Sequence, residues 1–586
     1  MLSVIITERV AALRREMQAA GIDVYYIPTD DHHGSEYVGE YFKSREYISG
    51  FTGSAGAVVI TQSYAGLWTD SRYYIQAEQQ LSGTEYVLNR SGEKDVISAV
   101  DHIIKIGGTV GFDGKCVNAG TAEKIAAAVG MENIISVDLI GKIWNDRPPM
   151  PCGKAFSLDI KYSGENTESK ISRLRKNLVE KKADYFLTSA PDEICWLLNV
   201  RGDDVKYNPV VLSYLAVTPD NIIWFVDEEK ISECFIPEYI KAAPYSDFYR
   251  FISDIPEGYS VLLDKKNLNY EAQSSLNNGV KIINGQSPLT LMKAVKNSIE
   301  MNNERQAHIK DGIAVTKFIC EIKTNPEKYT ELSAAELLIL LRNQQEGYIE
   351  ESFEPIIAYG AHGAVVHYSA DENSSCPLGQ SGFLLCDTGG HYYEGTTDIT
   401  RTVCLGEPAQ AMKAHYTAVL RGHLALANAV FKKGCHGYNL DILARGPLWE
   451  SGLDFGHGTG HGVGYLLNVH EAPNGFRMRY VEGHDCILEE GMITSDEPGL
   501  YIEGQYGIRI ESLLLCRNAE TTSFGEFMRF ENLTLVPFDP DAVEPSLMSE
   551  KEKSWYNEYQ KRVYDIISPY LSDSERKWLE NETRKI

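Results

Sequence analysis

The first half of the chain alternates amphipathic helical patterns with short β-rich segments. Residues 12–23 and 173–184 both have the apolar spacing of an amphipathic helix, and they run into DVYYIPTDD and DYFLTSAPDE, respectively. Farther along each half, GLWTDSRYY and IIWFVDEEK both have the pattern of a strand that ends in an exposed turn. The repeated order, at a nearly constant offset, predicts two tandem, related α/β domains.

Two proline- and glycine-containing stretches predict the domain boundaries. The segment Arg147–Gly153 contains three prolines, which remove amide donors and fix φ, so neither a helix nor a central strand crosses it. Asn284–Pro288 follows a β-like run, GVKII, and precedes a long helical pattern that starts at LMKAVKN. We therefore expect three domains, spanning residues 1–155, 156–290 and 291–586.

The third segment mixes helices with antiparallel strands. Ser333 and Glu336 have the spacing of a capping box at the start of ELLILLRNQQ. Runs such as GFLLCD and ITRTVCL are rich in apolar and β-branched residues and are separated by glycine-rich turns, which predicts strands. The C-terminal residues 549–586 have an amphipathic helical pattern, so we expect helices that dock on the domain or on a partner.

Composition and charge narrow the class of protein. Hydrophobic residues make up 43% and charged residues 24% of the 586 positions, which is typical of a folded, soluble protein. The 82 acidic and 56 basic side chains give a net charge of −26, which argues against nucleic acid as a partner. The N-terminus lacks the pattern of a signal peptide, and no apolar run approaches the roughly 20 residues of a membrane helix. We expect neither export nor a membrane partner.

Cysteine and histidine usage indicates where chemistry should be sought. The eleven cysteines include no C-x-x-C pair, which is typical of reduced thiols in a cytoplasmic enzyme. Ten of the fourteen histidines lie between His362 and His484. Since imidazole titrates near neutral pH and binds metals, we expect the reactive site in the C-terminal half.

Two aspartates there form the first candidate pair. Asp387 ends the strand pattern FLLCD, and Asp398 begins DITRTV after a glycine-bearing loop. A hairpin of this kind sets the two carboxylates side by side, where they repel each other unless a cation lies between them or one takes a proton. Loop aspartates more often form turns or caps, so this pair alone is weak support for a site.

Three further motifs add ligands to this pair. GHGTGHGVG holds His457 and His461, and its alternate glycines also resemble a nucleotide-binding loop, although the acidic partner and βαβ setting of such a loop are missing. Glu497 lies in ITSDEPG and Glu511 in IRIESLLLC, and each alone is more simply explained as a salt-bridge partner. Together the motifs supply two aspartates, one or two histidines and two glutamates, the donor set that a pair of hard divalent ions requires.

The series DTGGHY, TTDITRT, GHGTGHGVG, DEPG and GIRIE resembles the metal-binding signature of the pita-bread metallopeptidases, family M24B. GAVVHYS ahead of the first aspartate and LMKAVKN at the start of the last domain are similar to the long, three-domain Xaa-Pro aminopeptidases of that family. The resemblance implies an α/β protein with two tandem creatinase-N-like α/β domains, followed by a pita-bread catalytic domain of the α+β type.

The resemblance also implies roles for individual residues. The implied metal ligands are Asp387, Asp398, His461, Glu497 and Glu511. The implied catalytic residues are His367, which stabilises the oxyanion, His470, which shuttles protons, and Glu497, which accepts a proton from water. Substrate contacts are implied for Arg72, His367, His457, His470 and Arg509, and for Arg72 a local ion pair at a turn is an equally good explanation.

The activity that the resemblance implies is a dimetal aminopeptidase. It would release the N-terminal residue from Xaa-Pro-Yaa peptides by attack of a metal-bridging hydroxide on the Xaa-Pro bond. A ligand set without thiolate favours Mn²⁺, although Zn²⁺ or Co²⁺ would also bind. A cytoplasmic homodimer is implied by the family.

Three alternatives use the same fold. A prolidase shares the five ligands but cuts Xaa-Pro dipeptides, and the extra middle domain argues against it. A creatinase-like amidinohydrolase needs no metal, and a non-catalytic binding module typically loses ligands. Since none of the five ligand positions is replaced, we rank the amidinohydrolase and the binding module below the aminopeptidase and the prolidase.

Overall fold

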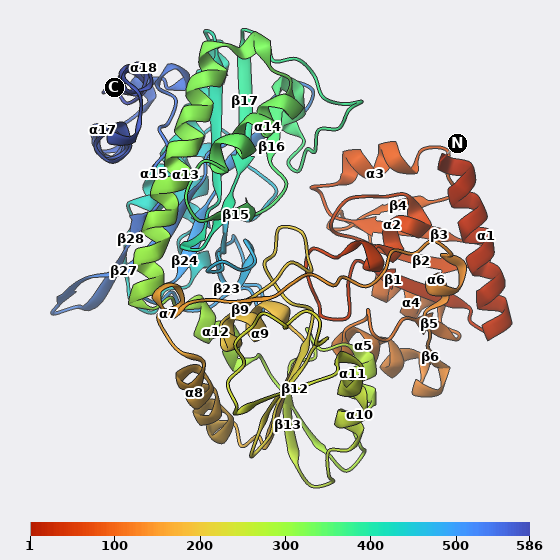
Figure 1. The fold of residues 1–586 in the computed structure, drawn as a ribbon. Coiled ribbons are helices and arrows are strands. Elements are labelled where there is room, and N and C mark those ends of the chain that lie inside the picture. Colours follow the sequence, from red (N-terminus) through yellow and green to blue (C-terminus); the bar gives the residue numbers. More distant parts are fainter. Residues whose placement is uncertain (1) are drawn as a thin grey trace. The chain divides into compact units, whose positions relative to one another are not determined.

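A computed structural model describes residues 2–586 (Figure 1). The chain forms two compact units: unit 1 comprises the residues up to Leu158 together with Asn166–Leu289, and unit 2 comprises Asp159–Glu165 and Thr290–Ile586. The division into three domains with boundaries near 155 and 290 stays a prediction.

Unit 1 contains two six-stranded sheets with the same strand order. In the first sheet the central strand β1 (Val24–Pro28) is antiparallel to β2 (Ala57–Thr61) and parallel to β5 (Val110–Phe112). In the second sheet β8 (Tyr185–Thr188) is antiparallel to β10 (Tyr214–Val217) and parallel to β13 (Ser260–Leu263). The order β4-β3-β2-β1-β5-β6 is repeated as β12-β11-β10-β8-β13-β14, which confirms the predicted tandem α/β repeat.

The remaining elements of unit 1 are its other strands, of which the two short ones at 156–157 and 200–201 form a separate two-stranded sheet, and its helices. Its other strands are β3 (Ala65–Thr69), β4 (Val87–Arg90), β6 (Ile134–Ser136), β7 (Phe156–Ser157), β9 (Val200–Arg201), β11 (Ile222–Phe225), β12 (Ile240–Ala243) and β14 (Lys281–Asn284). Its helices are α1 (Leu2–Ala20), α2 (Ser44–Ser49), α3 (Tyr74–Leu81), α4 (Ala99–Ile106), α5 (Ala119–Val129), α6 (Leu139–Ile143), α8 (Thr167–Glu180), α9 (Pro191–Leu198), α10 (Phe248–Ser253) and α11 (Tyr270–Ser274).

Apolar side chains cover both faces of the first sheet. Val10 and Leu13 of α1 pack with Tyr25 of β1 in one cluster, whereas Ile103 of α4 and Ile125 of α5 belong to a second cluster. Burial on both faces explains why these strands consist of near-continuous apolar runs.

The two repeats meet through equivalent loops. The residues that cap α5 and α11, Asn118 and Asn269, form an isolated antiparallel bridge with each other. Reciprocal backbone hydrogen bonds flank this bridge: Ala119 N donates to Leu268 O at 2.9 Å, Tyr270 N to Val117 O at 2.8 Å, Gly120 N to Lys265 O at 2.8 Å and Glu271 N to Gly114 O at 2.9 Å. The repeats of unit 1 therefore pack about a local pseudo-two-fold axis.

Unit 2 combines helices with several antiparallel sheets. Its largest sheet has the order β21-β28-β27-β24-β22-β23, and smaller ones are β16-β17-β20, β15-β18-β19 and β25-β26. These strands are β15 (Tyr348–Glu351), β16 (Ile356–Tyr359), β17 (Gly382–Thr388), β18 (Gly390–Tyr392), β19 (Gly395–Thr396), β20 (Ile399–Leu405), β21 (Val430–Lys432), β22 (Gly460–Gly462), β23 (Glu471–Phe476), β24 (Ile493–Asp496), β25 (Gly499–Ile502), β26 (Tyr506–Arg509), β27 (Ser512–Thr522) and β28 (Gly525–Asn532).

Helices cover these sheets. They are α7 (Ile160–Ser163), α12 (Pro288–Ala294), α13 (Ser298–Thr324), α14 (Glu331–Arg342), α15 (Gln410–Ala427), α16 (Asp441–Trp449), α17 (Glu550–Ile567) and α18 (Asp573–Glu582). The long helix α13 lies alongside β17 in Figure 1, and its Phe318 and Ile322 share an apolar cluster with Leu384 of β17. Val563 and Leu579 of the C-terminal helices are buried in the main apolar cluster of unit 2. Of the two arrangements expected from the sequence, docking on the domain or on a partner, the C-terminal helices adopt the first.

Helix α14 begins earlier than the sequence pattern predicts. Its N-cap is Thr330, and the capping box joins Thr330 to Ser333 rather than Ser333 to Glu336. The Thr330 hydroxyl accepts the backbone N–H of Ser333 at 3.2 Å, and the Ser333 hydroxyl accepts that of Thr330 at 2.8 Å. The predicted box was wrong because a serine can replace glutamate as the reciprocal partner, and the shift places Glu331 inside the helix.

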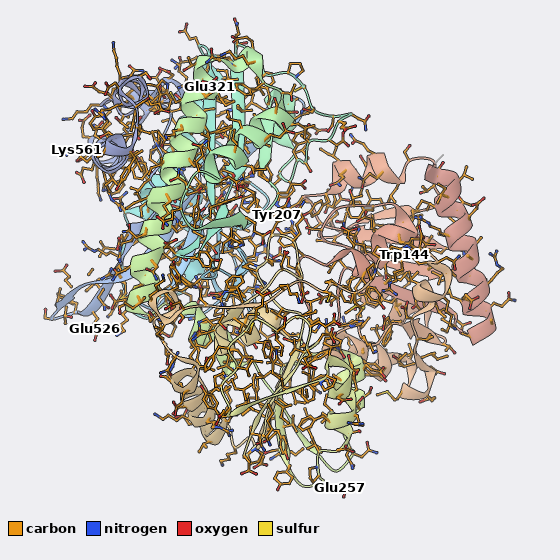
Figure 2. The ribbon with its side chains drawn as sticks, viewed as in Figure 1. Trp144, Tyr207, Glu257, Glu321, Glu526 and Lys561 are labelled. Atoms are coloured by element: carbon orange, nitrogen blue, oxygen red, sulfur yellow. The ribbon has the colours of Figure 1, made fainter. Side chains whose placement is uncertain are left out.

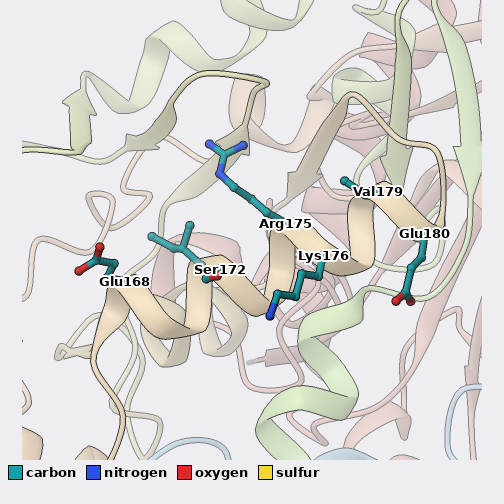
Figure 3. A pocket seen from close by; sticks show the side chains of 7 residues that line it. Glu168, Ser172, Arg175, Lys176, Val179 and Glu180 are labelled. Atoms are coloured by element: carbon teal, nitrogen blue, oxygen red, sulfur yellow. The ribbon is translucent and has the colours of Figure 1, made fainter.

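Two surface features of the units are a projecting hairpin and a shallow hollow. Glu526 lies on the β27–β28 hairpin, which projects from unit 2 (Figure 2). A hollow over α8 in unit 1 is lined by side chains of that one helix, including Arg175 and Lys176, which point in different directions (Figure 3). Within residues 2–586, no helix combines the length and the apolarity that crossing a membrane requires.

Candidate metal centre

Strand ends in two sheets of unit 2 carry the five predicted ligands. Asp387 lies in β17, which pairs antiparallel with β20, so Asp387 faces Thr400 across the sheet and Asp398 lies directly before β20. In the other sheet β22 carries His461, while Glu497 follows β24 and Glu511 precedes β27. Strand β24 pairs with both β22 and β27, which brings these three residues together.

Interatomic distances show how closely the side chains converge. Nε2 of His461 lies 3.3 Å from Asp398 Oδ2 and 3.7 Å from Glu497 Oε1. Ligand atoms of Asp398, His461 and Glu511 all lie within 4.8 Å of one another. The aspartate pairing and the clustering of the histidine with the glutamates agree with the sequence prediction, whereas the ligand roles stay predictions.

Two carboxylate oxygens of the cluster are buried without a hydrogen-bond partner. They are Oδ1 of Asp387 and Oε1 of Glu511. Asp387 is 8% exposed and Glu511 is 2% exposed. A buried acceptor without a partner is costly, and a carboxylate oxygen even more so, unless a cation lies beside it. The oxygen and imidazole donors, with no thiolate among them, fit hard or borderline divalent ions.

The electrostatics of the cluster point to the same missing positive charge. Burial, followed by repulsion from Asp398 and the other carboxylates, raises the pKa of Glu511 well above its ordinary value. Burial also raises the pKa of Asp387 and of Glu497, although Arg509 and His461, respectively, oppose the rise. Carboxyl groups this close together can all be ionised only when a cation lies among them. Such a cluster is therefore a candidate site for a divalent cation.

These shifts predict how the metal-free protein responds to pH. A carboxyl group whose pKa is higher in the folded state than in the unfolded state destabilises the fold as pH rises, because the unfolded chain releases its proton first. Chelated Glu511→Gln should therefore melt at a higher temperature than chelated wild type at about pH 7.5, and this difference should shrink toward about pH 5. Thermal melts of both proteins across this range test it, and a difference that is absent or grows on acidification would contradict it.

Neighbouring polar groups hold the ligands in place. Nδ1 of His461 donates to the Gly462 carbonyl at 2.9 Å, which leaves Nε2 available for the predicted ligand role. The Thr400 hydroxyl donates to Glu511 Oε2 at 2.7 Å, and the Ser495 hydroxyl contacts Glu497 Oε1 at 3.3 Å. The sequence prediction missed Thr400 and Ser495, although each lies two positions from a predicted ligand.

Arg509, Tyr501 and His457 form a connected chain beside the cluster. Arg509 is 2% exposed, pairs with Asp387 through Nη2 and donates through Nη1 to the Tyr501 hydroxyl at 2.6 Å. The same hydroxyl lies 2.8 Å from His457 Nε2, while His457 Nδ1 lies 2.7 Å from the Gly458 carbonyl. Burial raises the pKa of Tyr501 to about 12, so its hydroxyl stays protonated. Substrate contact by Arg509 and His457 stays a prediction.

The other two predicted histidines lie on segments tied to this region. His470 packs edge-on against His461, with ring centroids 4.3 Å apart. The next residue, Glu471, is buried between Lys293 at 2.8 Å and Lys296 at 2.6 Å, which fixes the start of β23. His367 is half-buried and follows Val366, whose carbonyl accepts from Arg509 at 3.4 Å.

Arg72 lies in unit 1 and is held locally. Its Nε and Nη2 donate to the two carboxylate oxygens of Asp70 at 2.8 and 2.7 Å. This is the local ion pair at a turn that the sequence analysis left open. Its substrate contact stays a prediction.

Glu331 is a hub that the sequence prediction missed. Its carboxylate is fully buried and accepts from the backbone N–H groups of Tyr359 and Cys376 at 2.8 and 3.1 Å. It also binds His362 Nδ1 at 2.8 Å and the Tyr368 hydroxyl at 2.9 Å. These four partners flank His367 on both sides, so Glu331 positions the loop that carries it.

We expect Glu331→Gln to lower kcat of the loaded protein by about 10- to 100-fold, because the change would displace the loop that carries His367, for which a catalytic role is predicted. The metal content of the five-residue cluster should not change, since Glu331 is not among its predicted ligands. Elemental analysis and steady-state kinetics measure both. Glu336→Gln, an exposed carboxylate on the same helix, is the matched control. Equal rates in the two variants would contradict the positioning role.

Comparisons with known proteins cover every part of the chain. Residues 302–518 match metallopeptidase family M24, and residues 526–586 match the C-terminal region of that family. Residues 9–143 and 146–300 each match a creatinase/prolidase N-terminal domain. The two N-terminal matches agree with the repeated sheets of unit 1.

Similar proteins match over most or all of their length. Aminopeptidase P2 of Arabidopsis thaliana is 36% identical over 100% of this chain and 89% of its own. A probable Xaa-Pro aminopeptidase P of Paracoccidioides brasiliensis is 36% identical over 99% of both chains. Among solved structures, the X-prolyl aminopeptidase of Caenorhabditis elegans, described as a cytosolic enzyme with a di-nuclear active site, is 34% identical and superposes with a TM-score of 0.92 over 99% of this chain and 100% of its own. The chain therefore belongs to the Xaa-Pro aminopeptidase P branch of the M24 metallopeptidases.

Proposed function

We propose that this protein is a dimetal aminopeptidase that releases the N-terminal residue from peptides with proline in the second position. The observation that carries the proposal is the convergence of Asp398, His461 and Glu511, with Asp387 and Glu497 beside them, in a chain that matches X-prolyl aminopeptidases from end to end. Asp387, Asp398, His461, Glu497 and Glu511 would hold two divalent ions. When bound, these ions acidify a water molecule and polarise the scissile carbonyl.

The chain's own residues supply the proton transfers. Glu497 accepts the proton of the attacking water. His367 donates a hydrogen bond to the carbonyl oxygen as negative charge develops on it. His470 delivers a proton to the departing proline nitrogen, because a neutral amine is a far better leaving group than its anion.

Charge complementarity explains trimming from the N-terminus. The free amino group of a peptide is a cation at neutral pH, and the acidic cluster offers it carboxylate acceptors. His457 is fixed by Tyr501 at 2.8 Å and lines the approach to Glu497, whose Oε2 lies 3.9 Å from its Nδ1. Arg72 and Arg509 complete the proposed substrate contacts, and Arg72 rests on the family resemblance alone.

Substrate length separates this proposal from a prolidase. We expect cleavage of a Xaa-Pro-Yaa tripeptide at the Xaa-Pro bond, with little release from the corresponding Xaa-Pro dipeptide. Mass spectrometry of both digests measures this, and Xaa-Ala-Yaa serves as the control for proline specificity. Preferential cleavage of the dipeptide would support a prolidase, and no cleavage of any peptide by metal-loaded protein would support a non-catalytic module.

The finer properties rest on donor chemistry and on relatives. We propose Mn²⁺ as the working ion because oxygen and imidazole donors without thiolate suit it, with Zn²⁺ and Co²⁺ as competitors. We also propose a cytoplasmic homodimer. Activity after reconstitution of chelated protein with each ion, and the mass of the protein in solution, test these points.

A further inference from the structure

Unit 1 carries a second group of metal-ligating side chains at the carboxyl ends of two parallel strands. His32 lies on the loop that follows β1, and Asp113 and Cys116 lie on the loop that follows β5. From β1 the sheet extends through β2 on one side and through β5 and β6 on the other. In open α/β sheets, ligands bind where the loops beyond the carboxyl ends of neighbouring strands diverge in this way.

The three side chains already lie at close range. An Nδ1 or Nε2 atom of His32, a carboxylate oxygen of Asp113 and Sγ of Cys116 are all within 4.8 Å of one another. The Cys116 thiol donates to Asp113 Oδ2 at 3.5 Å, and the backbone N–H of Lys115 donates to Asp113 Oδ1 at 3.0 Å. Nδ1 of His32 lies 3.3 Å from the Tyr245 hydroxyl, so the ring is oriented by a second contact, as in protein metal sites.

An independent observation indicates missing positive charge beside this group. Asp31, the neighbour of His32, is 1% exposed, and its Oδ2 has no hydrogen-bond partner. Asp30, Asp31 and Asp138 are further carboxylates whose charges act on the Cys116 thiol. Lys115 and Arg147 are the cations whose fields reach His32, and neither is an ion-pair partner of Asp31.

We propose that His32, Asp113 and Cys116 form a zinc-type site in unit 1, separate from the carboxylate-rich centre of unit 2. Imidazole, carboxylate and thiolate are the three donors that zinc accepts together, and three protein ligands leave the fourth tetrahedral position open to water. Binding replaces the proton of the Cys116 thiol with the ion, so one proton leaves as the metal–sulfur bond forms.

The position of the site gives it a structural role at the junction of the two repeats. The backbone carbonyl of His32 accepts from Asn269 Nδ2 at 2.8 Å, and Asn269 forms the isolated bridge with Asn118, two residues beyond Cys116. An ion held by His32 and Cys116 would tie the β1 and β5 loops together where they contact the second repeat. Because it binds the folded state alone, it would raise the melting temperature of unit 1.

Cobalt spectroscopy distinguishes this site from the centre in unit 2. Of the two proposed sites, the unit 1 site alone contains a sulfur ligand. Mn²⁺-loaded full-length protein titrated with Co²⁺ should therefore develop a near-ultraviolet thiolate-to-cobalt charge-transfer band that saturates near one ion per chain. Cobalt that exchanges into the other centre gives no such band, because no thiolate belongs to its predicted ligands. Zn²⁺ should abolish the band by competition.

Matched variants assign the band to its ligands. Cys116→Ser should lose it while retaining aminopeptidase activity, and His32→Ala should weaken it at least tenfold in affinity. Cys376→Ser should keep it. This control matters because Cys376 lies with Glu331 and His362 in unit 2 and is the strongest competing thiol among the described residues. No band in the wild type, a band that survives in Cys116→Ser, or one that disappears in Cys376→Ser would each overturn the proposal.

Discussion

Glu511→Gln is expected to lower kcat/KM for a Xaa-Pro-Yaa peptide by on the order of 10³-fold or more, equivalent to about 4 kcal/mol of transition-state stabilisation. The purified variant should also lose most of its bound divalent metal. Glu511 is 2% exposed, and its Oε1 has no partner other than the proposed ions. An amide in the same place keeps the shape of the side chain but removes the negative charge that holds the cations.

The same variant has opposite effects on activity and on metal-free stability. Loaded wild type should be active and stable, whereas the chelated form keeps several mutually repelling carboxylates that Glu511→Gln partly relieves. A variant that loses activity because it unfolds would be less stable than wild type both with metal and in chelator. Lower activity together with higher stability in chelator therefore identifies an electrostatic cause. Asp398→Asn should behave similarly, and Glu526→Gln on the exposed hairpin is the control. Full activity of wild type in chelator, or of Glu511→Gln with its metal retained, would disprove the assignment.

The repeated architecture of unit 1 could be predicted because its signal is local. The patterns around 12–23 and 173–184 predict an amphipathic helix followed by a buried strand in each repeat. The two sheets have the same strand order. Helix α14 shows the limit of such reasoning. Thr330 and Ser333 are both good capping residues, and their types alone do not decide which of them starts the helix; in the folded chain Thr330 is the N-cap, and Glu331 is buried.

The clustering of the candidate ligands could be predicted from residue type, whereas the groups that contact them could not. Carboxylates and histidines in apolar or glycine-rich settings stand out, since a buried charge needs a partner. Tyr501 and Thr400 are ordinary strand residues in the sequence. Their roles arise from sheet register: β25 pairs with β26 so that Tyr501 faces Gly507, close to Arg509, and β20 pairs with β17 so that Thr400 faces Asp387. Register between distant strands is a property of the folded chain.

Arg509 illustrates the same point and leads to the second large effect. A sequence pattern indicates only a cation near a glutamate, whereas the structure shows a guanidinium pairing with Asp387 and bonding Tyr501. We expect Arg509→Leu to lower the free energy of unfolding of the chelated protein by about 3–5 kcal/mol, because Asp387 is left buried without its counterion. Denaturant unfolding in chelator measures this.

Two further variants separate the charge from the hydrogen-bond geometry. Asp387→Asn added to Arg509→Leu should restore part of the lost stability, because it removes the unpaired charge, and a double-mutant cycle gives the coupling between the two side chains. Arg509→Lys should retain more stability than Arg509→Leu, since it keeps a cation near Asp387, but it should lose activity because an ammonium cannot reach Asp387 and Tyr501 with one planar fork. If Arg509→Leu is as stable as wild type in chelator, Asp387 is not held by this pair. If Arg509→Lys is fully active, the connection through Tyr501 to His457 does not contribute to catalysis.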